Sequence, residues 1–269
     1  MIEKKLSPNE THSTRDRAVS DLLAFVLVFG IIITSVGVVY IFGLGALGDA
    51  QAAQQDRNAE RAFSSMGASF NDLQTNRGQE RLAELNPRGA RMSIDEDSPE
   101  LEIEGIDEGF DESVGAMHYD NDNTRISYEL GAVFRSDDGN SVMVREPEFV
   151  SREVGGETRL IVSFVDIERD GPTAIGSEST MQIGAIQDDQ QRYTHDGDDV
   201  EITIRDSSHA KAWARYFDDN GWDNQDGGEI EVEDIETGDN VEVQYDVGSD
   251  AHVVVRGTDV ELSLERSES

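Results

Sequence analysis

The most prominent pattern in the chain is one uninterrupted apolar run near its N-terminus. Residues 22–48 contain no charged side chain, and Asp21 and Asp49 bound them. As a helix this run is roughly 40 Å long at about 1.5 Å per residue, which exceeds the hydrocarbon thickness of a bilayer. A cleavable secretory signal would have a shorter apolar core than this run. The run therefore predicts a transmembrane helix over residues 19–48.

Apolar residues continue after this span at helical spacing. They recur four, three, four and three residues apart, which is the period of one helix face, and form a set called the helix stripe below: Ala59, Phe63, Met66, Phe70 and Leu73. Charged residues expected on the opposite, solvated face are Asp56, Arg57, Glu60, Arg61 and Asp72. The pattern predicts an amphipathic stalk helix over residues 49–86, ending among the breaker residues Asn76, Gly78 and Pro87. Either the chain's own β domain or neighbouring subunits could cover the stripe.

From about residue 90 the period changes to two. Short alternating runs such as TRISYEL, SVMVRE and HVVVRG predict roughly ten strands. Hairpin signals lie at Asp137–Asn140 and Thr237–Asn240. Because the runs are short and evenly spaced, we predict a mainly antiparallel, β-sandwich-like domain over residues 90–269. The fold class is therefore α+β, with a long N-terminal transmembrane helix that continues into an amphipathic helix.

One short helix interrupts the predicted strands. Ser207 or Ser208 can cap its start, and Asn220 with Gly221 can end it. Trp213 and Phe217 lie four residues apart, so we predict that this pair is buried in the core. The alternative is an exposed adhesive or sugar-binding patch formed by Trp213, Tyr216 and Trp222.

Charge is distributed unevenly along the chain. Of the 57 acidic and 22 basic residues, four of each precede Leu22, which leaves 53 acids and 18 bases after the apolar run. Nucleic-acid binding is excluded, because phosphate binding needs clustered Lys and Arg. Lys211 is the one lysine after the run, and such a surface is typical of salt-adapted proteins. We expect a halophilic source and a fold that loosens in low salt, where carboxylates repel one another.

Basic residues next to the apolar run set the expected topology. Arg15 and Arg17 lie just before it, whereas a mixed, acidic stretch follows it, so the N-terminus should be cytoplasmic and the C-terminal domain extracellular. Within the run, Gly30, Thr34 and Gly37 fall on one helical face. Small residues in that pattern allow membrane helices to approach closely.

No pattern in the chain indicates catalysis. There are no cysteines, and the five histidines, among them His118 and His209, lack the spacing of a helical zinc site. Oxygen-rich turns give three calcium candidates, at residues 120–123, 196–199 and 223–227, but none completes a 12-residue EF-hand loop. We therefore predict no enzyme, no cofactor and no catalytic or metal-ligating residue.

The junction between leader and span carries a family resemblance. Residues 17–25, Arg-Ala-Val-Ser-Asp-Leu-Leu-Ala-Phe, followed by the apolar helix, resemble the class III signal of archaeal type IV pilin-like proteins. The resemblance implies that a prepilin peptidase cuts the leader, residues 1–18, between Ala18 and Val19, with Arg17 supplying the charge before the bond. The chain also resembles a set of uncharacterised haloarchaeal pilin-like proteins through the segment EITIRDSSHAKAWARYFDDNGW.

These observations lead to two hypotheses about function. The first is a membrane-anchored, pilin-like cell-surface protein, a structural or minor subunit of an envelope appendage in a halophile. Its partners would be membrane lipid, prepilin peptidase and pilin-like subunits. The second is a non-assembling, membrane-tethered extracellular binding domain, favoured because Asp21 and Leu23 stand where pilins of the archaeal and bacterial types carry proline and glutamate.

Overall fold

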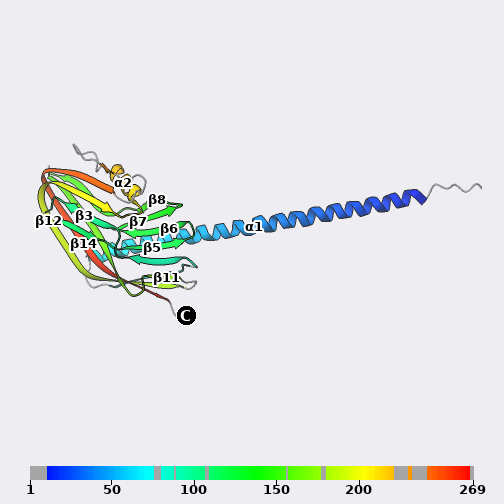
Figure 1. Cartoon of the computed structure of the whole chain (residues 1–269), viewed down its shortest axis with the longest axis horizontal. Coiled ribbons are helices and arrows are strands. Elements are labelled where there is room, and N and C mark those ends of the chain that lie inside the picture. The colour runs from blue at the N-terminus through cyan, green and yellow to red at the C-terminus, as the bar shows by residue number, and fades with distance from the viewer. Residues whose placement is uncertain are drawn as a thin grey trace, which may run out of the picture. The chain divides into compact units, whose positions relative to one another are not determined.

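The chain has an α+β fold. The computed structural model describes residues 11–75, 80–87, 89–106, 109–155, 157–176, 180–220, 230–231 and 241–266. One long N-terminal helix is followed by two mostly antiparallel sheets and one short helix (Figure 1), which confirms the predicted fold class. The chain divides into two compact units, Met1–Gln54 and Gln55–Ser269.

The helix α1 runs without interruption from Thr11 to Thr75. Its apolar part in the first unit, Ser20–Phe42, has a mean hydropathy of 2.8 and contains no buried residue. By length and composition this segment can cross a membrane, as the sequence predicted.

The predicted continuation of the helix to residue 86 is wrong. The helix ends at Thr75, and Glu80–Leu85 forms strand β1. All six β1 residues pair with β12, from Glu80 opposite Ile186 to Leu85 opposite Met181. Extended pairing provides partners for the backbone amides of this segment, and it places Leu85 in the core. The β domain therefore begins before residue 90.

The larger sheet has eight strands, built around two very long ones. Its order is β4-β3-β12-β14-β10-β9, with β1 paired to β12 and β13 paired to β14. The bounds are β3 Glu100–Glu104, β4 Phe110–Ser113, β9 Glu148–Val154, β10 Glu157–Asp170, β12 Met181–Arg205, β13 Ile230–Glu231 and β14 Val241–Arg266. All pairs in this sheet are antiparallel except β10 with β14.

The period-two pattern breaks into shorter runs within β12 and β14, such as HVVVRG in β14. In the structure β12 and β14 pair from Met181 opposite Arg266 to Ile204 opposite Val241 (Figure 1). Register shifts between Gln187 and Gln190 and between residues 197 and 199 interrupt the alternation within this pair. Such irregularities break the period-two pattern while pairing continues, so the breaks in pattern were wrongly read as strand ends.

The smaller sheet has six strands in the order β11-β2-β5-β6-β7-β8. Their bounds are β2 Arg91–Asp95, β5 Ala116–Asn121, β6 Thr124–Glu129, β7 Ala132–Asp137, β8 Asn140–Arg145 and β11 Ala174–Gly176. The hairpin predicted at Asp137–Asn140 joins β7 to β8. Asp138 and Gly139 there have φ of 51° and 83°, the left-handed values that a two-residue type I′ turn requires. The hairpin predicted at 237–240 lies outside the described residues.

Two helices cover opposite faces of the smaller sheet. Val133 and Phe134 are consecutive on β7, so their side chains point to opposite faces. Val133 lies in the core cluster that contains the helix stripe, and Phe134 lies in the cluster that contains α2 (Ala210–Asp219). Ring contacts agree: Phe70 of α1 meets Tyr128 edge to face at 5.0 Å, and Phe134 meets Trp213 of α2 at 5.3 Å.

The helix stripe belongs to the core of its own domain. Its five residues are between 0% and 4% exposed, and they pack with residues from both sheets. Of the two partners left open by the sequence, the structure shows the chain's own β domain. This part of α1 is therefore a core helix, covered by the first of the two partners that the sequence left open.

One residue of the expected solvated face is also buried. Asp56 is 6% exposed and accepts a 2.6 Å hydrogen bond from the Asn121 side chain at the end of β5. Glu60, one turn later, forms an ion pair with Arg135 of β7 at 3.4 Å. Helical periodicity alone therefore assigned Asp56 to solvent incorrectly, whereas Glu60 stays partly exposed beside its partner.

Candidate functional site

The residues predicted for processing and helix association all lie in α1. Arg17, Ala18 and Val19 are part of its N-terminal turns. Gly30, Thr34 and Gly37 lie in the exposed span, and both glycines have open space where a Cβ atom would stand. The predicted small-residue face is therefore unobstructed within this unit, while any role in processing or association stays a prediction.

The helix α2 is held in place by aromatic packing. Trp213 and Phe217 are fully buried and their rings stack 5.9 Å apart, which confirms the predicted core pair. Tyr216 is 6% exposed, and its hydroxyl donates to the Phe149 carbonyl at 3.3 Å. Burial of Trp213 and Tyr216 contradicts an exposed aromatic patch, whose third member, Trp222, lies outside the described residues.

The start of α2 differs from the predicted cap. His209 occupies the N-cap and makes no capping hydrogen bond with its side chain. The Ser207 hydroxyl instead accepts from the His209 backbone N–H at 3.1 Å and donates to the carboxylate of Glu129. The Ser207 hydroxyl therefore makes a long-range hydrogen bond to Glu129 and does not cap α2. Asn220 ends the helix as predicted.

Glu129, at the end of β6, is a buried carboxylate that the sequence analysis missed. Its Oε1 atom accepts hydrogen bonds from the indole Nε1 of Trp213, at 2.7 Å, and from the Ser207 hydroxyl. Burial raises the pKa of Glu129 to about 7, although both hydrogen bonds act to lower it. The carboxylate is 78 residues from Ser207 and 84 from Trp213, so no local motif could reveal it.

A serine and a histidine also meet beside α2. The Ser141 hydroxyl of β8 lies 2.8 Å from Nδ1 of His209, and the Ser136 hydroxyl contacts Ser141. This spacing would suit a nucleophile and its base. Burial lowers the pKa of His209 to about 3, however, which makes the imidazole a very weak base at neutral pH. The group that faces Nε2 is the Ser208 hydroxyl at 3.4 Å. The arrangement is that of a neutral hydrogen-bonded bridge between β8 and α2.

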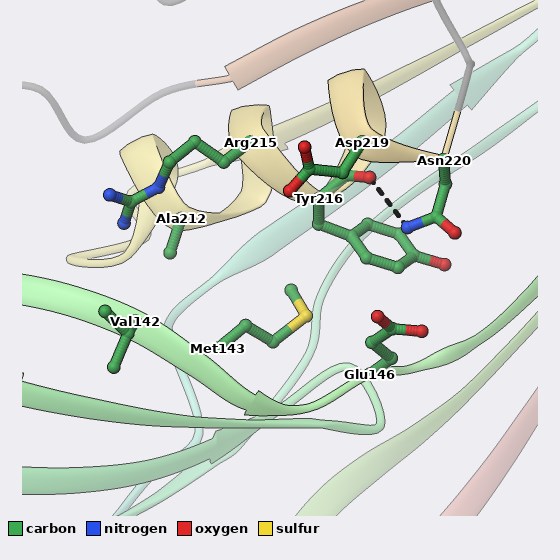
Figure 2. Close-up of a pocket in the computed structure, with 8 residues that line it drawn as sticks. All are labelled: Val142, Met143, Glu146, Ala212, Arg215, Tyr216, Asp219 and Asn220. Carbon is green, nitrogen blue, oxygen red and sulfur yellow. Dashed lines mark hydrogen bonds between the residues drawn. The ribbon is translucent and has the colours of Figure 1, made fainter.

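A pocket opens next to this bridge, between α2 and β8. Its volume is about 280 Å³, and we call it the α2 pocket. Figure 2 shows its eight lining residues: Val142, Met143, Glu146, Ala212, Arg215, Tyr216, Asp219 and Asn220. The members from α2 recur three, four and seven residues after Ala212, which places them on one helix face. The sequence showed this spacing, but it could not show that β8 lies opposite.

The α2 pocket has apolar walls and a charged rim. Ala212 and Tyr216 are buried and Met143 is half-buried, whereas Glu146, Arg215 and Asp219 are exposed. The Arg215 guanidinium is engaged, since it donates to the carbonyl of Ser141. The rim therefore presents the carboxylates of Glu146, just after β8, and of Asp219 on α2, together with the Arg215 guanidinium.

The structure brings no metal-ligand set together within the described residues. Of the calcium candidates, Asp120 pairs with Arg125 at 2.6 Å and Asn121 binds Asp56. Asp120 therefore links β5 to β6, and Asn121 links β5 to α1. Residues 196–199 lie within β12, and residues 223–227 are outside the described part of the chain.

Comparison with known proteins gives a family and no activity. No curated protein and no solved structure matches the chain. A family model described as a family of unknown function, DUF7289, matches residues 17–263. This match begins at Arg17, just before the apolar span, and it includes both sheets and α2 almost to the end of β14. The chain therefore belongs to the DUF7289 family.

Proposed function

We propose that this chain is a membrane-anchored, pilin-like cell-surface protein that serves as a structural or minor subunit of an envelope appendage in a halophile. The observation that carries the proposal is that α1 contains two different kinds of segment. One continuous helix contains an exposed apolar segment, Ser20–Phe42, and the buried helix stripe of an acidic β domain. A helix of this kind joins a membrane span directly to a folded domain.

The leader supports the same function. Arg15 and Arg17 precede the span, which favours a cytoplasmic N-terminus and an extracellular β domain. Resemblance to class III signals gives the Ala18–Val19 bond as the cleavage site for a prepilin peptidase. Lateral contacts with other pilin-like subunits would then use the open face of Gly30, Thr34 and Gly37.

The test is the N-terminus of the mature protein. The membrane-extracted protein is analysed by intact mass and N-terminal sequencing, from cells with and without prepilin peptidase. We expect a chain that starts at Val19 in the first case and at Met1 in the second. Arg17→Glu should block processing, while Arg15→Glu, a matched charge reversal two residues earlier, should leave it intact.

Each outcome decides a separate part of the proposal. An intact Met1 terminus in the presence of the peptidase would overturn the pilin-like route and leave a tethered domain. A processed chain that forms no filament and copurifies with no pilin-like subunit would overturn the assembly role while keeping the export route.

The second candidate function is a non-assembling, membrane-tethered binding domain. The α2 pocket favours it, because a structural subunit needs no concave site with apolar walls and a charged rim. The Asp21 and Leu23 departures from pilin patterns favour it as well. Under either candidate we assign no catalytic role to the Ser141–His209 pair, because burial lowers the pKa of His209 to about 3 and leaves a weak base.

A further inference from the structure

We propose that the α2 pocket binds a small alkylammonium ion, with Glu146 and Asp219 as the counter-charges and Met143 and Tyr216 as the apolar walls. This inference concerns the β domain alone, so it does not depend on whether the chain assembles into filaments.

The charges on the rim favour a cation. Glu146 and Asp219 both line the pocket, from the residue that follows β8 and from the last turn of α2. Within the described part of the chain, neither carboxylate has a basic partner. The Arg215 guanidinium also lines the pocket and donates to the Ser141 carbonyl, so two carboxylates outnumber one positive charge on the rim. Figure 2 shows the Glu146 carboxylate directed toward the Tyr216 ring.

The walls favour an organic cation over a metal ion. A metal would need several oxygen or nitrogen ligands at about 2.0–2.6 Å, and no such group occurs among the described residues. A thioether and a tyrosine ring are poor metal ligands, but they suit the methyl and methylene groups of an alkylammonium ion. Figure 2 places the Met143 sulfur in the space between β8 and α2, where it can contact such groups.

The size of the pocket agrees with a small ligand. Its volume of about 280 Å³ is close to the lower end of the range of about 300–1,000 Å³ that is typical of ligand pockets. It can hold a trimethylammonium group with a short arm, but not a folded peptide segment. We therefore choose choline as the probe and 3,3-dimethylbutan-1-ol, its neutral isostere, as the matched control.

The proposed test is titration of the full-length protein in detergent, labelled with ¹³C at the methionine methyl groups. The Met143 methyl resonance should shift saturably with choline and not with the neutral alcohol. Glu146→Gln and Asp219→Asn should each weaken choline binding about fivefold to tenfold, because each removes one counter-charge. Glu153→Gln, an exposed acid of β9 outside the pocket, should leave the affinity unchanged.

Three results would overturn the proposal. Equal shifts with choline and the alcohol would show an apolar site without charge selectivity. Unchanged affinity for choline in both Glu146→Gln and Asp219→Asn would show that these carboxylates do not contribute to binding. No shift of Met143 up to about 100 mM choline, in about 0.5 M or 3 M salt, would show that the pocket does not take this class of ligand.

Discussion

Asp166 and Asp259 lie directly opposite each other across the parallel strand pair of β10 with β14. Two positions later Glu168 faces Glu261 in the same way. Like charges in opposed positions destabilise a sheet. Burial and the carboxylates of Asp166, Glu168 and Asp189 raise the pKa of Asp259 to about 6. The pKa of Asp166 is raised too, mainly by burial, while the Gly115 N–H that it accepts at 2.8 Å lowers it.

Asp259→Asn should stabilise the domain near pH 8 in dilute salt by about 1 kcal/mol, a value reduced for partial solvent screening. A carboxyl whose folded pKa is raised binds more protons in the folded state. The free energy of unfolding of the wild type should therefore fall as the pH rises from about 4 to about 6. Unfolding by urea at several pH values measures this.

Salt provides the control for that prediction. At 1 M salt the Debye length is about 3 Å, so the gain from Asp259→Asn should shrink strongly in molar KCl. Asp170→Asn, at an exposed position opposite Ser263, should change stability little at any salt concentration. A gain from Asp259→Asn that is independent of salt and pH would contradict charge repulsion as its cause.

Glu129→Gln tests the buried carboxylate below α2. Because its folded pKa is raised to about 7, the wild type should lose stability as the pH rises from about 4.5 through 7. The glutamine oxygen can still accept from Trp213 and Ser207, so the variant should be more stable than the wild type at pH 8 by about 2 kcal/mol. Its free energy of unfolding should also change less with pH than that of the wild type. Thermal unfolding monitored by tryptophan fluorescence follows both.

Glu129→Ala serves as the contrasting variant. It leaves the buried Nε1 of Trp213 and the Ser207 hydroxyl without this acceptor, at a cost of about 1–3 kcal/mol. We expect it to be less stable than Glu129→Gln at every pH. Equal stability of the two variants would show that the carboxylate's hydrogen bonds do not anchor α2.

Phe63→Ala tests the helix stripe. Phe63 is fully buried in the core shared with both sheets, so its removal should cost about 3–5 kcal/mol. Arg61→Ala, on the exposed side of the same helix, should stay within about 0.5 kcal/mol. If Phe63→Ala weakened only self-association and left the unfolding free energy of the monomer unchanged, the stripe would be an intersubunit surface.

Gly30→Leu and Gly37→Leu test the open face of the apolar segment Ser20–Phe42. Bulky side chains there should hold helices apart and weaken association in bilayers by about 1 kcal/mol, or about fivefold, for each substitution. Ser35→Leu adds similar bulk on the opposite face of the same helix and should have little effect. Energy transfer between labelled copies measures the association. Equal loss in all three variants would contradict a specific small-residue face.

The sequence alone was sufficient to predict the apolar span, the helix stripe, the hairpin at Asp137–Asn140 and the α+β class. Each of these depends on residues close together in the chain, whose spacing reflects the geometry of a helix, a strand or a turn. The charge imbalance is likewise a property of composition.

Only the tertiary structure decided which surfaces those elements cover. Asp56 had the position of a solvated residue until Asn121, 65 residues away, was shown to bind it. The buried role of Glu129 depends on Ser207 and Trp213, which are distant in sequence and donate hydrogen bonds to its carboxylate. The strands β12 and β14 remain continuous through irregularities, because their backbone groups pair with each other regardless of side-chain pattern. Long-range contacts of this kind leave no local period in the sequence, and therefore the partner of each face could be found only from the folded chain.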